Sequence, residues 1–284
     1  GMALIYAELG TMEFAKLAPL AQSLSECGGI NLTLRVGLAL VIVGFGFKLA
    51  LAPFHMWTPD VYQGAPAPVT AFVATVGKGA MFALLLRFFS AVDIHAMPNV
   101  ASLFTIIAIL SMFLGNLLGL LQYDVKRLLA YSSIAHLGYL LVAFLASGVH
   151  AATAVAFYLT AYFVTTIGAF GVLAALSGPK CDISHLDELR GLYWRRPFMA
   201  AVMTAMMLSL SGIPLTAGFV GKFFVLAAGQ QANEWPAIIA LVLSSAIGLV
   251  YYLRVIVSMC YMDHGHNEYD NKFKDVPLAA NTDT

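Results

Sequence analysis

Charged residues are scarce in this sequence. Aspartate, glutamate, lysine and arginine make up 11% of its 284 residues, whereas 60% are hydrophobic. A soluble domain carries about a quarter charged residues and is about half apolar, so the shortage of charge excludes an ordinary soluble domain. The mean hydropathy of +0.83 indicates an all-α protein, a polytopic bundle of transmembrane helices. Because the formal net charge is zero, we expect no nucleic-acid partner.

Cysteines are also few and widely separated. Cys27, Cys181 and Cys260 form no C-x-x-C pair, which excludes a disulfide framework, a zinc site or an iron–sulfur cluster built by this chain alone. The sequence also lacks a G-x-G-x-x-G turn, so we expect no nucleotide site. It therefore predicts that this chain holds no cofactor.

The first residues lack the basic segment with which a signal peptide begins. Residues 1–6, Gly-Met-Ala-Leu-Ile-Tyr, are apolar instead. They are typical of the end of a helix, so we interpret the sequence as a fragment whose first helices are missing. Initiation at Met2 is the alternative.

Long apolar runs are what the sequence has in abundance. A bilayer core about 30 Å thick needs about 20 apolar residues per helix, and by that rule the chain has about seven spans. They lie near residues 31–54 (to 62 in the longer interpretation), 66–90, 100–121, 125–147, 149–176, 197–228 and 234–262. Residues 11–29 are a polar connection, and residues 263–284 are a polar tail.

Basic residues between the spans are distributed unevenly. The face that holds residues 11–29 carries Lys16, with Arg35 and Arg87 near helix ends. The opposite face collects Lys126, Arg127, Lys180, Arg190, Arg195, Arg196, Lys272 and Lys274. Because cytoplasmic loops are enriched in lysine and arginine, we predict that this second face is cytoplasmic, or faces the matrix or stroma of an organelle. Chance placement of a few basic residues is the alternative.

Three lysines fall inside the predicted spans. Lys48, Lys78 and Lys222 are each flanked by apolar residues and glycine. A lysine at the centre of a bilayer costs about 2.5–3.5 kcal/mol, so three of them indicate function. The alternative is that each side chain reaches the membrane surface along its apolar stem.

These lysines have no carboxylate nearby in the sequence. Asp60, Asp124, Asp187 and Glu188 lie near helix ends or in loops, and Glu8 lies in the first helix end. A lysine removed from water releases its proton more readily, whereas a nearby carboxylate holds the proton in place. A lysine with a movable carboxylate neighbour is therefore a switchable proton site. We expect that carboxylate to come from helices missing at the N-terminus or from a neighbouring subunit.

Two prolines interrupt the spans that hold lysines. Pro53 follows Lys48 by five residues, and Pro214 precedes Lys222 by eight. Proline removes a backbone donor and clashes with the preceding turn, so each helix should be discontinuous there. Broken helices within a membrane occur where they line a wet cavity or an ion site, although a simple kink is the alternative.

A polar stripe marks the span between them. Ser132, His136 and Tyr139 follow the spacing i, i+4, i+7 and should share one helix face. A histidine can relay a proton near neutral pH, although a hydrogen-bonded packing histidine has the same pattern. Further side chains could extend a water path or serve helix packing: Tyr158, Thr160, Tyr162, Thr165 and Thr166, with His55 as a weaker candidate.

Three motifs resemble those of a known family. They are GFKLALAPFHMWTPDVYQGAPAPV (residues 46–69), KRLLAYSSIAHLGY (residues 126–139) and LSLSGIPLTAGFVGKF (residues 208–223). Together they are similar to the subunit N family of bacterial NADH:quinone oxidoreductase, complex I, the counterpart of mitochondrial subunit 2. This resemblance covers the C-terminal portion of that antiporter-like family and extends to about residue 262 of this chain.

The resemblance implies an antiporter-like fold with inverted repeats and two discontinuous helices. Residues 1–30 would be a helix end and an extracytoplasmic connection, 31–92 the remainder of the first repeat, 93–262 the second repeat, and 263–284 a polar tail. The family's buried lysines, broken helices and central histidine match, in that order, Lys48, Lys78, Lys222, Pro53, Pro214 and His136. The family's essential glutamate has no match, since its helix is absent from this sequence.

The resemblance also implies a function. The chain would be a proton-translocating membrane subunit in the bacterial inner membrane, packed against other membrane-arm subunits. NADH, quinone, flavin and iron–sulfur clusters would belong to those other subunits. A subunit of a multisubunit sodium/proton antiporter is the alternative, and residues 58–62, Thr-Pro-Asp-Val-Tyr, favour the first reading. A structural spacer is a third hypothesis, against which the three lysines argue.

Overall fold

The computed structural model describes residues 1–14, 16, 32–92, 98–146, 148–178 and 183–261. Cys27, Cys181, Lys180, most of the connection at 11–29 and the tail after Tyr261 lie outside the described residues. The described chain is helical throughout, apart from turns and isolated β-bridges such as that between Asp124 and His185. The all-α prediction is confirmed.

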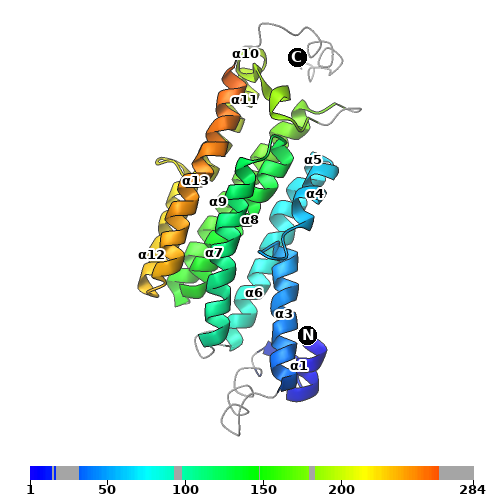
Figure 1. Ribbon diagram of the computed structural model, residues 1–284, viewed down its shortest axis with the longest axis vertical. Coiled ribbons are helices and arrows are strands. Elements are labelled where there is room, and N and C mark those ends of the chain that lie inside the picture. The colour runs from blue at the N-terminus through cyan, green and yellow to red at the C-terminus, as the bar shows by residue number, and fades with distance from the viewer. Residues whose placement is uncertain (15, 17–31, 93–97, 147, 179–182, 262–284) are drawn as a thin grey trace, which may run out of the picture.

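Long, nearly parallel helices form one bundle (Figure 1). In chain order the elements are α1 (Met2–Leu9), α3 (Leu32–Leu49), α4 (Trp57–Gly64), α5 (Ala67–Phe72), the π-helix η1 (Val73–Gly77), α6 (Lys78–Val92), α7 (Pro98–Leu120), α8 (Val125–Ala146), α9 (Gly148–Leu176), the 3-10 helix η3 (Leu186–Leu189), α10 (Leu192–Arg195), α11 (Pro197–Ser211), α12 (Ala217–Gln231) and α13 (Trp235–Cys260).

The helices match the predicted spans closely. Among the described residues, six segments are long and apolar enough to cross a membrane, and α5, η1 and α6 together make one of them. The shorter helices α11 and α12 follow each other across a break and correspond to the predicted span at 197–228. The count of about seven spans is therefore confirmed.

Both predicted helix breaks are present, and they share one local structure. α3 ends at Leu49, the residue four positions before Pro53, where the proline ring would collide with the helix carbonyl. Ala50 then adopts a left-handed φ of 59°, and the amide of Leu51 donates to the carbonyl of Gly46 at 2.8 Å. This is the Schellman ending of a helix, with alanine at the position usually taken by glycine.

The second break repeats this ending. Gly212 has a φ of 80° after the last residue of α11, and the amide of Ile213 donates to the carbonyl of Leu208 at 3.2 Å. The amide of Gly212 also donates to the carbonyl of Ser209 at 3.1 Å. Each break therefore satisfies part of the backbone that it frees.

Helix α8 forms the centre of the bundle. All of its residues from Val125 to Leu145 are buried except Arg127, and α4, α7, α9, α12 and α13 pack around it. Two apolar clusters cover its two ends: one holds Val125 and the other extends from Ala135. Polar side chains of α8 lie near the junction of these clusters, so the middle of the bundle is its polar part.

Candidate functional site

Lys78 lies inside the bundle at the start of α6. It directly follows the π-helical turn η1, and such turns are frequent at functional sites. Its side chain is 1% exposed, and its Nζ donates a hydrogen bond of 2.6 Å to Ser133 Oγ. Tyr162 OH donates to the same Ser133 oxygen at 2.7 Å. The ring of Tyr62 lies 5.3 Å from Nζ. One enclosed ammonium is thus linked to two hydroxyl groups.

His136 occupies the middle of α8 between two tyrosines. Its Nδ1 is 2.7 Å from Tyr158 OH, and its Nε2 is 3.1 Å from Tyr252 OH. Tyr252 OH is also hydrogen-bonded to Ser132 Oγ. Ser132 and His136 therefore share a face, as predicted, and that face meets α13. Because both ring nitrogens have hydroxyl partners, either tautomer of the imidazole can be accommodated.

Tyr139, the third residue of the predicted stripe, is held by an amide. Asn116 Nδ2 donates to Tyr139 OH at 2.9 Å, and Tyr251 OH donates to Asn116 Oδ1 at 2.9 Å. Asn116 Nδ2 also donates to the carbonyl of Met112 at 2.9 Å. The Asn116 amide thus joins α7, α8 and α13, and the ring of Tyr139 lies 5.2 Å from Lys222 Nζ.

Lys222 lies on α12 and is 7% exposed. Its Nζ donates to the carbonyl oxygens of Leu210 and Ser211 at 3.2 and 2.8 Å, and to Ser245 Oγ at 2.8 Å. The two carbonyls belong to the C-terminal end of α11, where the helix dipole favours a cation. The Lys222 side chain lines a cavity of about 330 Å³. Residues of α11, α12 and α13 bound this cavity, together with Pro214 from the break between α11 and α12.

Lys48 differs from the other two lysines. It lies in the last turn of α3, so its backbone position is also at the C-terminal end of a half-helix. Its side chain, however, is exposed in the described structure, as is that of neighbouring Phe47, while Gly46 and Leu49 face the interior. Lys48 therefore lies in a membrane span, as predicted, but the described residues of this chain do not cover its side chain, and its role stays a prediction.

Several other predicted residues have ordinary structural roles. Thr160 and Thr165 donate to carbonyls of their own helix, at 2.8 Å to Ala156 and 2.9 Å to Ala161. These hydroxyl groups therefore donate to their own helix and to no other described side chain of the network, although Thr165 also lines a small void beside Tyr162 and His136. His55 is buried at 5% exposure, but no hydrogen-bond partner of its ring nitrogens is present among the described residues.

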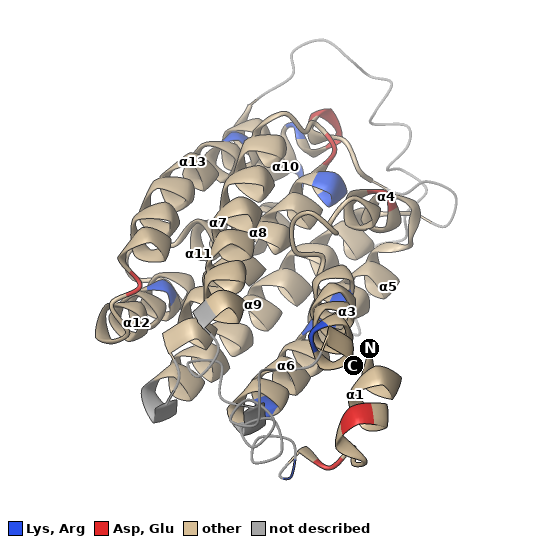
Figure 2. Cartoon of the chain, turned by 60° about the horizontal axis from the view of Figure 1, so that its bottom comes forward, with Lys and Arg blue, Asp and Glu red and all other residues tan. Residues whose placement is uncertain are grey.

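The acidic residues of the described segments lie outside this interior network. Figure 2 shows the acidic segments at helix ends and in connections. Asp124, although buried, precedes α8 and accepts a hydrogen bond from the amide of Arg127 at 2.9 Å. No carboxylate contacts Lys78 or Lys222 within the described ranges. The expected carboxylate partner thus remains a prediction.

Several members of the network were not among the residues predicted from the sequence. Ser133, Asn116, Ser245, Tyr251 and Tyr252 were not singled out. A polar residue in the middle of a predicted span, such as Asn116, was an available signal. The tyrosines of α13 gave none, since they lie more than a hundred residues away from their partners and only packing brings them together.

This fold, with six long apolar helices, two broken helices and two enclosed lysines among the described residues, is that of a polytopic helical membrane protein. The chain belongs to the family of NADH:quinone oxidoreductase and Mrp antiporter transmembrane subunits, whose model matches residues 1–248. It is a multi-pass integral membrane protein.

Two individual relatives within this family are both subunit N proteins of NADH-quinone oxidoreductase. The chain is 52% identical over 276 residues to NADH-quinone oxidoreductase subunit N of Ectopseudomonas mendocina, covering 96% of this chain and 55% of that protein. It is 49% identical over 263 residues to subunit N of Methylococcus capsulatus, covering 91% and 52%. The chain therefore spans about half the length of these relatives.

Solved structures agree on the fold. A chain of respiratory complex I from Thermus thermophilus matches with a TM-score of 0.77 and 39% identity, covering 93% of this chain and 56% of that one. A chain of the Mrp complex from a Dietzia species matches with a TM-score of 0.82 but only 24% identity, covering 92% and 47%. At that identity the second match supports the fold alone.

Proposed function

We propose that this chain is part of a proton-translocating membrane subunit of an NADH:quinone oxidoreductase in a bacterial inner membrane. The observation that carries the proposal is the pair of enclosed lysines, Lys78 and Lys222, at opposite sides of a chain of hydroxyl groups and one imidazole. The sequence identity of 52% and 49% to two subunit N proteins favours this assignment over a sodium/proton antiporter subunit.

Proton transfer near Lys78 uses groups that can both give and accept a proton. Lys78 passes a proton to the Ser133 and Tyr162 hydroxyl pair, to which it is hydrogen-bonded. The rings of Tyr162 and His136 lie 5.5 Å apart, centre to centre. A void of about 10 Å³, lined by both rings and by Thr165, lies beside them. That volume is about one water molecule, which would link the two groups.

The other end of the path is His136 to Lys222. His136 contacts Tyr158 and Tyr252, and Tyr139 lies one turn further along α8, with its ring against the ammonium of Lys222. The cavity beside Lys222 has room for several water molecules. We assign Lys78, His136 and Lys222 as proton carriers, with Ser132 and Tyr139 as supporting groups. Lys48, whose side chain the described residues of this chain leave exposed, is a further carrier.

The driving reaction occurs elsewhere in this proposal. Other subunits of the complex hold the flavin and the iron–sulfur clusters, and act on NADH and quinone. This subunit receives an electrostatic or conformational signal through neighbouring membrane-arm subunits. A carboxylate from such a neighbour, or from another part of the full-length subunit, would change the charge next to a lysine and so its hold on the proton.

Alanine and arginine variants test the proposal. Lys78→Ala and Lys222→Ala, made in the full-length subunit within the complex, should lower NADH-driven proton uptake by inverted vesicles at least about tenfold, as loss of an acid–base group does. Arginine at either position should rescue poorly because its guanidinium does not release a proton. Lys16→Ala is the matched control, since this lysine lies on the surface and pairs with Glu13.

Assembly must be measured beside transport. A blot of the purified complex and NADH oxidation with an artificial electron acceptor should stay near the wild-type level in every variant. Wild-type proton uptake by both alanine variants would contradict the proposal. Good rescue by arginine would instead assign a purely electrostatic role to the lysines.

A further inference from the structure

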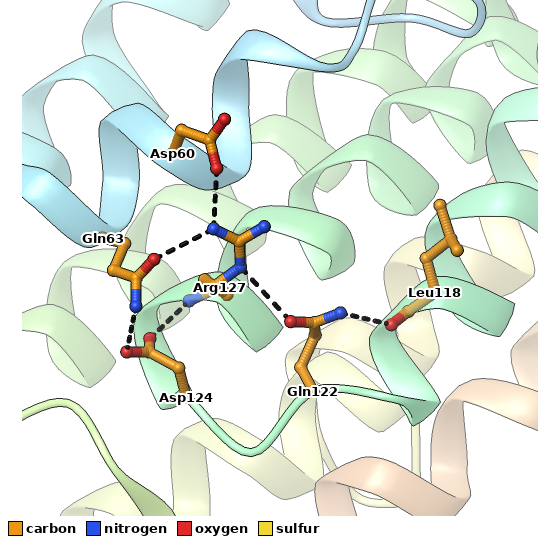
Figure 3. A network of polar contacts seen from close by, with 6 residues as sticks. All are labelled: Asp60, Gln63, Leu118, Gln122, Asp124 and Arg127. Atoms are coloured by element: carbon orange, nitrogen blue, oxygen red, sulfur yellow. Dashed lines mark hydrogen bonds and ion pairs between the residues drawn. The ribbon is translucent and has the colours of Figure 1, made fainter.

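The short helix α4 is held in place by a basic pair at the start of α8. Arg127 Nη1 donates to Asp60 Oδ1 at 2.6 Å and to Gln63 Oε1 at 2.9 Å (Figure 3). Lys126 Nζ donates to the carbonyl of Ala65, directly after α4, at 3.0 Å. A helix of eight residues is not stable by itself, so its position depends on such contacts.

The arginine is itself fixed on its own side. Its Nε donates to Gln122 Oε1 at 3.3 Å, and Gln122 Nε2 donates to the carbonyl of Leu118 at 3.1 Å (Figure 3). Asp124 completes the set, because its carboxylate accepts from the amide of Arg127 at 2.9 Å and from Gln63 Nε2 at 3.0 Å. Arg127 thus connects α4 to the α7–α8 connection from both ends of its guanidinium group.

The opposite face of α4 covers Lys78. Tyr62 lies between Asp60 and Gln63 in sequence. Its side chain is fully buried, whereas those of Asp60 and Gln63 are exposed. Its ring lies 5.3 Å from Lys78 Nζ and meets the ring of Phe170 edge-on at 5.9 Å. The orientation of α4 that the arginine fixes is therefore the one in which a tyrosine ring closes over the ammonium.

The outer contact is the weaker part of this arrangement. The Asp60 side chain is 72% exposed and that of Arg127 is 26% exposed. Ion pairs in contact with water are weak and are screened by salt. The pair can therefore open without disrupting the buried core of α8.

We propose that Arg127 is a positioning residue for Lys78. Arg127 holds α4 in the orientation in which Tyr62 keeps water away from the Lys78 ammonium. Its effect on proton transport rests on the proposed function, whereas its effect on the water access of residue 78 does not. Loosening the Arg127–Asp60 contact lets α4 and Tyr62 move away from Lys78. Water then reaches Lys78 from the side of the membrane at which α8 begins.

A cysteine at position 78 measures this access directly. The host is the full-length subunit in its purified complex, with Lys78→Cys and with serine in place of Cys27, Cys181, Cys260 and any further cysteine of that subunit. Labelling is read on this subunit after the subunits are separated. The rate of labelling by a charged, water-soluble maleimide should be low. Arg127→Gln and Asp60→Asn should each raise it about fivefold, the factor expected for loss of one such contact. Arg254→Gln is the matched control, because this arginine donates to the carbonyl of Leu120 and packs on the ring of Tyr123.

Three comparisons separate positioning from general damage. The Asp60→Asn/Arg127→Gln double variant should label no faster than either single variant, since both open the same contact. Arg127→Lys should restore part of the protection. Added salt should speed labelling when the pair is intact and have little effect in the double variant.

The two proposals fail in different ways. Equal labelling rates in all variants, or an equal rise with Arg254→Gln, would overturn the positioning role of Arg127. Faster labelling together with normal proton uptake, measured in complexes that retain Lys78, would support that positioning role. It would contradict the assignment of Lys78 as a proton carrier, and so the proposed function.

Discussion

Asn116 joins three helices through one buried side chain, which makes its replacement by alanine informative. The amide donates to Tyr139 OH and Met112 O and accepts from Tyr251 OH, so its acceptor and both donor hydrogens are used. The substitution Asn116→Ala removes all three contacts at once. We expect the full-length subunit to lose stability and the Tyr139 ring to lose its fixed position next to Lys222.

The size of the effect follows from the groups left behind. A buried hydroxyl left without any partner costs about 1–3 kcal/mol, so two tyrosines set an upper bound of roughly 2–6 kcal/mol. Ser244 and Ser245 also contact Tyr139 OH, and Tyr252 and Ser132 also contact Tyr251 OH, so the loss is smaller than this bound. Removing the amide creates space that a water molecule could occupy, which places the expected loss at the lower end of this range. A loss of about 2–3 kcal/mol should lower the unfolding temperature by several degrees.

Gly248 supplies the matched second substitution. A Cβ built on Gly248 would lie 2.8 Å from Asn116 Oδ1, so Gly248→Ala alone forces the amide aside and should cost about 1–3 kcal/mol. When Asn116 is already alanine, that oxygen is gone and the new methyl group has room. The double variant should therefore be more stable than the sum of the two single losses by at least about 1 kcal/mol.

Thermal unfolding of the purified full-length subunit in detergent, followed by tyrosine and tryptophan fluorescence, measures all four proteins. The control is Gly171→Ala, because no atom lies within 4 Å of a Cβ built there. An unchanged unfolding temperature for Asn116→Ala would refute the argument that this amide holds three helices together. Strictly additive losses would refute the proposed contact with Gly248.

Two further predictions follow from single contacts. A Cβ on Gly218 would lie 1.8 Å from the backbone oxygen of Ser209, so Gly218→Ala should prevent α12 from docking on α11 and abolish assembly, as a blot of the complex would reveal. Tyr252→Phe removes the hydroxyl that contacts His136 but keeps the ring. It should leave assembly intact and lower NADH-driven proton uptake, whereas unchanged uptake would place Tyr252 outside the path.

Features governed by local chemistry could be predicted from the sequence. Runs of apolar residues gave the spans, and proline gave both breaks, because its ring acts on the turn directly before it. The shared face of Ser132 and His136 also followed, since helical spacing alone decides it.

Features governed by packing could not be predicted in the same way. Lys48 and Lys78 have similar apolar neighbours in sequence, yet one side chain is exposed and the other is enclosed by Ser133 and Tyr62. Their difference depends on which side of each helix faces the interior of the bundle. The π-helical turn before Lys78 was likewise absent from the prediction, because residues 73–77 carry no proline and read as an ordinary helix.

Asn116 and Lys222 should respond differently to alanine because their free-energy balances differ. Burial of the Lys222 ammonium costs about 2.5–3.5 kcal/mol, and its contacts with Leu210, Ser211 and Ser245 offset that cost. Lys222→Ala removes both terms, and water in the adjoining cavity can reach the freed carbonyls. The stability of the Lys222→Ala subunit should therefore change little, while NADH-driven proton uptake falls. Asn116 carries no charge, so its loss removes contacts without a comparable gain and should affect stability first.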